Sequence, residues 1–282
     1  MDGRAVAPAA GTVLNALATG YGAAFAIDEY VAAEVTLGGS RFSGEIDGHP
    51  EADTTLVEEC VRRVCRAYDG PDGGHVRTET EVPLASGLKS SSAAANATVL
   101  ATLDALGVAD QLTREEAARL GVEAARAAGV TVTGAFDDAS ASMLGGLTIT
   151  HNTEDVLLLH DDVAWQVAVW IPPERAFSAD ADVDRCERIA PMAELVRELA
   201  LQGRYATAMT VNGFAFAAAL QRPTEPMVEA LPEVAGVSLS GTGPSYVAVG
   251  GPSAIDAVLD RWHEREGTTI RTETQHHGAM IE

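Results

Sequence analysis

The sequence predicts a mixed fold of the α/β or α+β class, and three observations support this. Strand-like segments, in which apolar residues alternate, take turns with helix-like segments along the chain. The 282 residues suffice for one large domain or two smaller ones, and 46% of them are hydrophobic, as in globular proteins. The paired prolines Pro172 and Pro173 precede an acidic stretch that marks a loop or a boundary. We expect two domains, 1–150 and 151–282.

The first expected helix lies within 50–68, because Leu56 and Val61 repeat on one face and Asp53 or Thr54 can cap its start. Serine and alanine residues predict a second helix that Gly107 ends. In the third, Thr113 and Glu116 form a capping box. In chain order, strands are expected at 30–38, 75–84, 143–151 and 165–172, as a strand, turn and strand within 234–250, and at 268–277. The other helices are expected at 91–107, 113–129, 188–200, 204–220 and 253–266.

The charge balance is strongly acidic. The net charge is -22, and Lys89 is the single lysine beside eighteen arginines. Nucleic acids and anionic membrane surfaces require a basic footprint, so neither is an expected partner. An acidic surface with almost no lysine resembles that of proteins from salt-loving archaea, where salt screens the repulsion between carboxylates. The alternative is an ordinary acidic cytosolic protein.

The three cysteines, Cys60, Cys65 and Cys186, have neither the spacing of a zinc site nor that of a disulfide framework. We expect Cys60 and Cys65 to be buried thiols in a helix. The N-terminal stretch lacks the apolar core of a signal peptide, and no run of about 18 apolar residues could span a membrane. A reducing cytoplasm is the expected location.

The stretch from Pro83 to Leu100 places Gly87, Lys89 and three serines at the start of an alanine-rich helix. Glycine permits a close backbone approach, and the unpaired N–H groups of a helix start attract phosphate. Serine hydroxyls can also ligate Mg²⁺. The stretch does not match a Walker A loop, because Leu88 separates the glycine from the lysine. The alternative is a serine-capped helix with a lysine that points to solvent.

A second candidate site contains Asp137 and Asp138, which are expected to stand between a turn and the strand at 143–151. Adjacent carboxylates are costly unless a cation or a proton transfer uses them. The alternative is an exposed acidic turn.

The third candidate site is a glycine-rich turn. Gly241 and Gly243 flank Thr242 between two apolar strands. This pattern fits either a hairpin turn or a backbone nest that binds phosphate.

Together, the three motifs resemble those of the GHMP kinases, the superfamily of galactokinase, homoserine kinase and mevalonate kinase. The family's middle motif, P-x-x-x-G-L-x-S-S-A-A, is matched from Pro83 to Ala94 with one extra serine. Its N-terminal strand and loop match 7–28, and its C-terminal turn matches Ser240 to Ser245. The stretches 86–97, 129–142 and 240–246 together are most similar to the archaeal shikimate kinase branch. Asn15 to Gly22 replaces the Gly-Glu-His element of galactokinases and mevalonate kinases with small residues.

The resemblance implies a GHMP kinase fold with two α/β domains, mixed sheets and an active site in the cleft between the domains. It implies transfer of the γ-phosphoryl group of ATP, with Mg²⁺, to shikimate, a step of aromatic amino-acid biosynthesis. Asp138 would accept or orient the hydroxyl proton, Asp137 could exchange roles with it, and Lys89 would offset the moving charge.

The resemblance also implies further contacts. Asn15 and Asp138 would contact the acceptor. The implied metal ligands are Ser91, Ser92 and Glu123. The implied contacts to ATP and its phosphates are Pro83, Leu84, Ala85, Ser86, Gly87, Leu88, Lys89, Ser90, Ser91, Ser92, Ala93, Gly241, Thr242 and Gly243.

Other readings remain open at this level. Homoserine kinase and other small-alcohol kinases share the phosphate motifs and differ in the acceptor pocket, and a nucleotide-binding homologue without catalysis is a further alternative. Shikimate carries a carboxylate that an arginine is expected to meet, with Arg4, Arg175, Arg185 and Arg204 as candidates. ATP and shikimate are the expected partners of a monomer or a small homo-oligomer.

Overall fold

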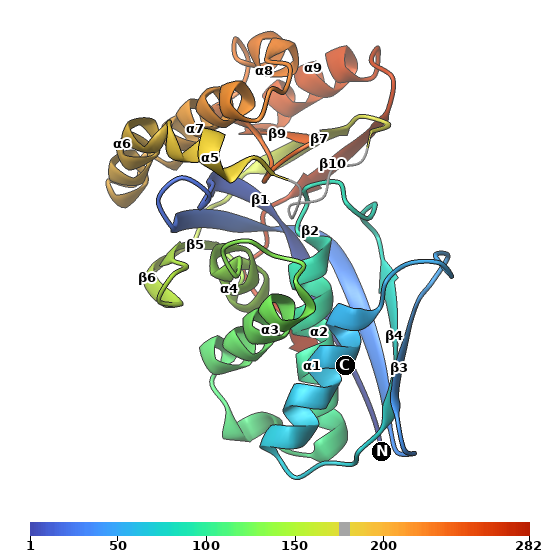
Figure 1. Ribbon diagram of the computed structural model, residues 1–282. Helices are drawn as coiled ribbons and strands as arrows, with labels where there is room; N and C mark the ends of the chain where they lie inside the picture. Colours follow the sequence, from blue (N-terminus) through green and yellow to red (C-terminus); the bar gives the residue numbers. More distant parts are fainter. Residues whose placement is uncertain (175–180) are drawn as a thin grey trace.

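The computed structural model describes residues 1–174 and 181–282 and arranges them in two lobes (Figure 1). The larger lobe carries α1 to α4, and the smaller lobe carries α5 to α9. In chain order the elements are β1 (Asp2–Leu14), β2 (Tyr21–Leu37), β3 (Phe42–Ile46), α1 (Thr55–Ala67), β4 (Gly74–Thr80), α2 (Ser90–Leu106), the short helix η1 (Ala109–Gln111), α3 (Arg114–Ala128), α4 (Phe136–Leu144), β5 (Leu147–His151), β6 (Val156–Asp161), β7 (Gln166–Ile171), α5 (Val183–Glu187), α6 (Ala190–Leu201), α7 (Tyr205–Ala219), α8 (Glu225–Ala230), β8 (Gly236–Leu239), β9 (Tyr246–Gly250), α9 (Pro252–Trp262), β10 (Thr268–Glu273) and β11 (Met280–Ile281).

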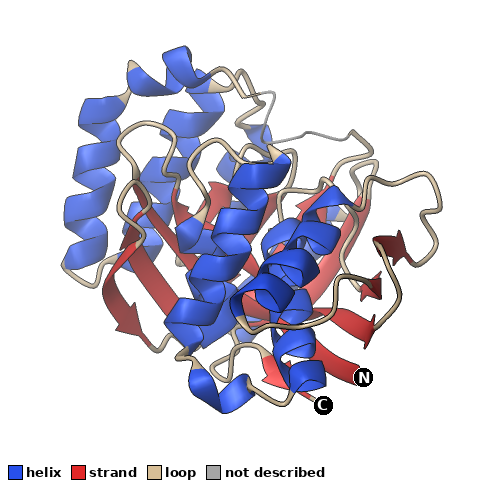
Figure 2. Cartoon of the chain, turned by 60° about the horizontal axis from the view of Figure 1, so that its bottom comes forward, coloured by secondary structure: helices blue, strands red, loops and turns tan. Residues whose placement is uncertain are grey.

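The sheet of the larger lobe is mixed. Its order is β11-β1-β2-β4-β3, in which β3 and β4 run parallel and the other neighbours run antiparallel. Strand β2 is long enough to pair with β5 over its first residues and with β4 over its last. The four helices cover one face of this sheet, as Figures 1 and 2 show. The hairpin of β1 and β2 therefore extends from the larger lobe up to the smaller one.

Helix α2 lies at the centre of the larger lobe because its side chains are small. Most of its residues are buried, and they are mainly alanine and threonine. Small side chains let the helix approach β1 closely, since a Cβ at Gly3 would lie 2.1 Å from the backbone oxygen of Ala101. The close packing of α2 on β1 and β2 fixes the position of its first turn, which lies at the junction of the lobes.

The smaller lobe has an antiparallel sheet of order β10-β7-β9-β8. Helix α7 packs on β8, and α9 packs on β7 and β9. Trp262 and Tyr246 are among its largest buried side chains, and Trp170 stacks on Tyr246 with ring centroids 5.6 Å apart. Trp170 and Trp262 therefore belong to the core of this lobe. The strand β11 leaves this lobe and pairs with β1 in the first sheet.

The local signals read from the sequence are largely confirmed. Thr113 and Glu116 form the expected capping box at α3, and Gly107 ends α2 with a φ of +68°. At α1, the Oδ1 atom of Asp53 accepts a hydrogen bond from the N–H of Thr55, whereas Thr54 makes no side-chain cap. Cys60, Cys65 and Cys186 are buried free thiols.

One expectation was wrong. Asp137 and Asp138 lie in the first turn of helix α4, not in a turn that leads directly to a strand. The helix has nine residues and a weak apolar pattern rich in small side chains, so tertiary packing, not periodicity, decides it. The strand begins only at Leu147, after Gly145 and Gly146, whose φ angles of +76° and +64° make the turn. The strands β3, β6 and β11, the helices α5 and α8 and the short helix η1 had no predicted counterpart.

The boundary near residue 150 stays a prediction. The first sheet includes strands up to Asp161, and the second begins at Gln166. Across the described residues, no helix combines the length and the apolar character needed to cross a membrane.

Candidate active site

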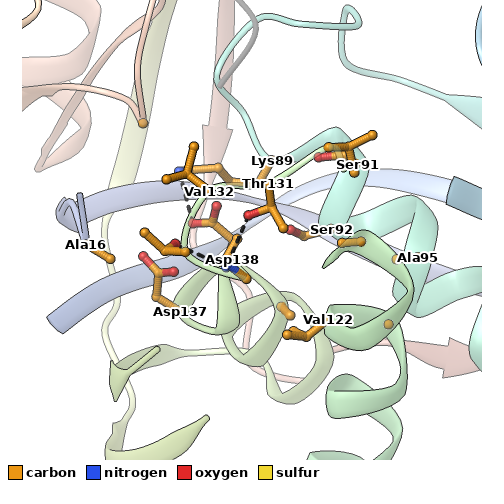
Figure 3. Close-up of a pocket in the computed structure, with 18 of the residues that line it drawn as sticks. Ala16, Lys89, Ser91, Ser92, Ala95, Val122, Thr131, Val132, Asp137 and Asp138 are labelled. Carbon is orange, nitrogen blue, oxygen red and sulfur yellow. Dashed lines mark hydrogen bonds and ion pairs between the residues drawn. The ribbon is translucent and has the colours of Figure 1, made fainter. Parts of the chain in front are cut away.

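A cleft opens between the two lobes at the start of α2 (Figure 3). Its walls are the tip of the β1–β2 hairpin, the first turn of α2, the loop 130–135, the first turn of α4 and the turn at Gly241 and Thr242. Its space, with the open mouth, is about 740 Å³. All three glycine-containing motifs of the sequence reach this cleft.

Lys89 is the residue from which α2 starts, and its backbone is left-handed, with a φ of +64°. Its side chain does not cap the helix. The first N–H groups of α2 therefore remain available at the cleft, where Ser91 and Ser92 also lie. Aligned N–H groups beside hydroxyls are suited to bind the oxygens of phosphate.

The loop before Lys89 is held by the turn at Ser240 to Ser245. The Oγ of Ser240 donates to the oxygen of Gly87 at 2.9 Å, and the Oγ of Ser245 donates to the oxygen of Ser86. The N–H of Ala10 on β1 donates to the oxygen of Leu88 at 3.1 Å. Gly87 is required here, because its φ is +86° and a Cβ would lie 2.6 Å from the oxygen of Ser240. Segments from both lobes thus fix the loop.

Lys89 points into the site. Its Nζ lies 2.9 Å from the Oδ1 of Asp138, and these side chains are only 9% and 14% exposed. The contact is an ion pair without hydrogen-bond geometry, so this Oδ1 has no hydrogen-bond donor among the described residues. The Nζ also lies against the third motif, since a Cβ at Gly241 would lie 2.9 Å from it. The alternative that Lys89 points to solvent is therefore excluded, and the ammonium lies between a carboxylate and the glycine-rich turn.

Asp137 is buried beside this pair, with 5% of its surface exposed. Its Oδ1 accepts a hydrogen bond of 2.7 Å from the Nδ2 of Asn152. Burial, and then the neighbouring charge of Asp138, raise the pKa of Asp137 to about 7, while Lys89 and Asn152 oppose this rise. A carboxyl group that can change its charge near neutral pH is suited to proton transfer. It is not part of an exposed acidic turn.

Asn15 lines the cleft, but its polar groups also have partners in the protein. Its Nδ2 donates to the oxygen of Gly241, and its backbone N–H donates to the Oδ1 of Asn212, both at 2.9 Å. Asn212 is a buried residue of α7 that the sequence did not single out. The hairpin tip of the larger lobe is thereby joined to the smaller lobe.

Comparison with known proteins agrees with this geometry. The family model of the GHMP kinases N terminal domain matches residues 55–146. The chain is 69% identical to a shikimate kinase of Halobacterium salinarum over 99% of both chains. It is 48% identical to a shikimate kinase of Methanothrix thermoacetophila over 100% of this chain and 96% of the relative. The chain belongs to the shikimate kinase branch of the GHMP kinases.

Solved structures show the same fold at low identity. A homoserine kinase from Cytophaga hutchinsonii superimposes with a TM-score of 0.77 at 17% identity, over 100% of this chain and 97% of that one. A galactokinase from Lactococcus lactis gives a TM-score of 0.74 at 14% identity, over 99% and 95% of the two chains. The expected GHMP kinase fold with mixed sheets and helices is confirmed.

The expected metal ligand Glu123 lies outside the cleft of this kinase. Its side chain is 54% exposed, and its Oε2 lies 3.0 Å from the Nη1 of Arg63 on α1. Helix α3 instead presents Gly121, Val122 and Ala125 to the cleft. The carboxylates that line the cleft within the described part of the chain are those of Asp137 and Asp138.

The candidate arginines also lie elsewhere in this kinase. Arg4 on β1 pairs with two glutamates, Arg185 donates to the oxygen of Ala219, and Arg204 precedes α7. None of these three lines the cleft. Arg175 falls outside the described residues.

An arginine that the sequence did not single out lies beside the third motif. The Nε of Arg222 is buried and has no hydrogen-bond partner among the described residues. A Cβ at Gly243 would lie 3.5 Å from this Nε. The guanidinium has one long ion pair, 3.9 Å from the exposed carboxylate of Glu174. Two cations therefore approach this turn, Lys89 at Gly241 and Arg222 at Gly243, and Arg222 does not itself line the cleft.

Proposed function

We propose that this kinase transfers the γ-phosphoryl group of ATP to a hydroxyl of shikimate. The observation that carries the proposal is the ion pair of Lys89 and Asp138 at the start of α2, in a chain 69% identical to a shikimate kinase. A cation and a carboxylate at the N-terminus of a helix are the groups that phosphoryl transfer to an alcohol requires.

The phosphates of ATP would bind at the first turn of α2. The N–H groups after Lys89, the hydroxyls of Ser91 and Ser92, and the turn at 241–243 all face the cleft or border it. The oxygens of Ser86 and Gly87 are held by the third motif, which fixes the loop before a ligand arrives. A loop ordered in advance lowers the entropic cost of binding.

Magnesium fits the donors at this place. The hydroxyls of Ser91 and Ser92 are hard oxygen donors, which Mg²⁺ prefers. The described residues contain no group of three or more histidine, cysteine or acidic side chains that could hold a metal ion by themselves. Mg²⁺ bound with nucleotide uses one or two protein groups, and these residues can supply them. When bound, it would neutralise charge on the phosphates.

In the transfer, Asp138 would accept or orient the proton of the attacking hydroxyl. The ammonium of Lys89, 2.9 Å away, pairs with this carboxylate and faces the phosphate loop, where it would stabilise the charge that moves to the leaving oxygen. Asp137 lies beside Asp138 as a second carboxyl group that could take the same role, with its pKa raised to about 7.

Arg222 is the cation that we assign to the carboxylate of the acceptor. A buried guanidinium nitrogen without a partner is costly, and a carboxylate would satisfy it. Arg222 borders Gly243 outside the lining of the cleft, so it would meet the acceptor's carboxylate only where the acceptor extends past the turn at 241–243. Asn15, at the hairpin tip, would form another wall of the acceptor site.

The test is a panel of acceptors offered to the purified kinase with ATP and Mg²⁺ in high salt. Phosphorus NMR would follow the product directly. We expect a phosphomonoester with shikimate and none with homoserine, mevalonate or galactose. Turnover of homoserine with shikimate untouched would favour the homoserine kinase alternative, and binding of ATP without any turnover would favour a non-catalytic homologue.

The setting that we infer is a salt-rich cytoplasm, in keeping with a net charge of -22 and three free thiols. ATP and the acceptor are the partners of this proposal, for a monomer or a small homo-oligomer.

A further inference from the structure

Asn152 joins four segments of the active site. It follows β5 and is fully buried. Its backbone N–H donates to the oxygen of Gly20 at 2.8 Å, and its own oxygen accepts from the Nη2 of Arg126 at 3.0 Å. Its Nδ2 donates to the Oγ1 of Thr133 at 3.3 Å and to the Oδ1 of Asp137 at 2.7 Å. One residue thus connects the hairpin, α3, the loop over the cleft and the first turn of α4.

The orientation of the Asn152 amide is fixed by its partners. Its Oδ1 accepts from the backbone N–H of Asp137 at 3.1 Å and from the Oγ1 of Thr150 at 2.7 Å. Both donors and both acceptor positions of the amide are therefore used. A flipped amide would direct its oxygen at the carboxylate of Asp137 and its NH₂ at a backbone N–H, and both contacts would be repulsive.

Asp137 is held from the other side as well. A Cβ at Gly22 of β2 would lie 2.4 Å from its Oδ2, so the carboxylate rests against bare backbone. The charged groups that act on Asp137 are Asp138 on its own helix and Lys89 at the start of α2. Strand β2 presents Gly22 to this carboxylate, and Asn152 is neutral. The amide of Asn152 is thus the side-chain hydrogen-bond donor that opposes the burial of Asp137.

We propose that Asn152 is a positioning residue for phosphoryl transfer: its amide holds the carboxylate and the backbone of Asp137, and thereby keeps Asp138 in contact with Lys89 at the cleft. The identity of the reaction rests on the function proposed above, whereas the geometry does not. Asn152 itself does not line the cleft, so its influence on the reaction passes through Asp137 and the loop that contains Thr133.

The experiment compares two fully buried asparagines that both contact α4. Asn152→Ala removes the amide that holds Asp137. Asn96→Ala is the matched control, because the Nδ2 of Asn96 donates to the oxygen of Ala139, away from the carboxylates. Asn152→Asp keeps the shape and the acceptors but removes the donors and adds a third negative charge. Circular dichroism would give the folded fraction by which each rate is corrected.

We expect kcat per folded molecule to fall about 10- to 100-fold in both Asn152 variants, the range for a catalytic group displaced by roughly 1 Å. The affinity for ATP should stay near the wild-type value. The pH at which the rate changes should move upward, because Asp137 loses a donor that favours its ionised form. Asn96→Ala should leave both the corrected rate and the pH profile unchanged.

Carbon NMR of protein labelled at the aspartate carboxyls provides a readout that requires no acceptor. The titration of Asp137 should move to higher pH in both Asn152 variants and stay in place in Asn96→Ala. If Asn152→Ala does not fold, Asn152→Asp carries the same comparison. An unmoved titration and an unmoved pH profile in the folded variants would overturn the proposal. If the wild-type protein does not phosphorylate shikimate, the proposed function is overturned, whereas the NMR titration still tests the role of Asn152.

Discussion

Two residues at the cleft adopt backbone conformations that side chains rarely take. Lys89 has a φ of +64° and Ala135, just before α4, has a φ of +52°. Each such conformation costs roughly 1–3 kcal/mol, and it persists only where the surroundings hold it. These two residues begin the helices that carry the ion pair of Lys89 and Asp138. The strain therefore lies where side chains from two helices must meet at a fixed distance.

At this residue scale, Asp138→Asn should lower kcat far more than it weakens ATP binding. The carboxylate acts on a proton that moves only in the transition state, so the loss should be about 100- to 10,000-fold in kcat. Asp137→Asn should cost less, because Asp137 is buried behind Asp138. Steady-state rates and ATP titrations with both variants would check this. A kcat near the wild-type value in both variants would show that neither carboxylate takes part in the reaction.

Asp137→Asn should also change how stability depends on pH. The pKa of Asp137, about 7 in the folded protein, lies above its ordinary value of 3.8. Between these values the folded state binds more protons than the unfolded state, so this group lowers stability as pH rises from about 4 to 7. The variant should exceed the wild type in free energy of unfolding at about pH 8, by up to about 4 kcal/mol, and match it near pH 4. Denaturant titrations at the two pH values would measure this. A gain of equal size at both would contradict the raised pKa.

Arg222→Gln should raise the KM for shikimate and leave ATP affinity unchanged. Loss of a charge-assisted, bidentate contact to a carboxylate costs about 2–5 kcal/mol, which corresponds to an increase of at least about 30-fold. Arg185→Gln is the matched control, because Arg185 donates to backbone oxygens at the end of α7. Equal KM values for the two variants would show that another cation meets the acceptor.

At the scale of elements, the phosphate loop depends on a contact between the lobes. The loop before α2 belongs to the larger lobe, yet its carbonyl oxygens accept hydrogen bonds from the turn between β8 and β9. The first turn of α2 is thereby placed against Gly241, with the Nζ of Lys89 between them. Helix α4 approaches from below and supplies the two carboxylates. Each element supplies one part of the site, and none supplies the site alone.

Gly87→Ala tests this contact. The substitution forces a side chain into a φ of +86° and brings its Cβ to 2.6 Å from the oxygen of Ser240. Gly107→Ala, at the end of α2, has a similar φ of +68° but nothing within 4 Å. The control should lose only about 1 kcal/mol of stability. We expect Gly87→Ala to lose more and, unlike the control, to bind ATP at least 10-fold more weakly, as one tenfold step corresponds to about 1.4 kcal/mol. Calorimetry would measure the stability and the ATP affinity of each variant. Equal ATP affinities would show that the contact between Gly87 and the turn at Ser240 does not hold the phosphate loop.

At the scale of the whole molecule, the acidic surface covers an ordinary apolar interior. The net charge is -22, and the ion pairs near the surface use arginine rather than lysine. Such a charge destabilises the compact state through repulsion unless salt screens it. The active-site lysine is exempt from this pattern because its charge is paired and largely buried.

We therefore expect both the free energy of unfolding and kcat to rise as KCl increases from low concentrations to about 3 M, where the screening length falls below about 3 Å. Denaturation by urea at each salt concentration would measure the first, and initial rates the second. Sucrose at matched water activity is the control, because it favours compactness without screening charge. Full stability at low salt would contradict the halophilic adaptation.

The sequence by itself determined the local features whose physical causes are local. The capping box at Thr113, the end of α2 at Gly107 and the serine-rich start of that helix need only neighbouring residues, so they could be predicted. The same holds for the order of the three glycine-containing motifs and for the family that they resemble. Lys89 could be named as a candidate because it is the single lysine of the chain, and Asp138 because it aligns with the catalytic aspartate of the family.

Only the tertiary structure decided which of these groups meet. Helix α4 is short and weakly patterned, so packing placed Asp137 and Asp138 in a helix where a turn was expected. Glu123 pairs with Arg63 instead of lining the cleft. Asn152 contacts the carboxylate of Asp137, and Arg222 lies beside the third motif, although no local sequence pattern indicates either position. Contacts between residues far apart in the chain depend on how sheets and helices stack. A local sequence pattern does not determine that stacking, because the stacking depends on how side chains from the whole chain pack together in the core.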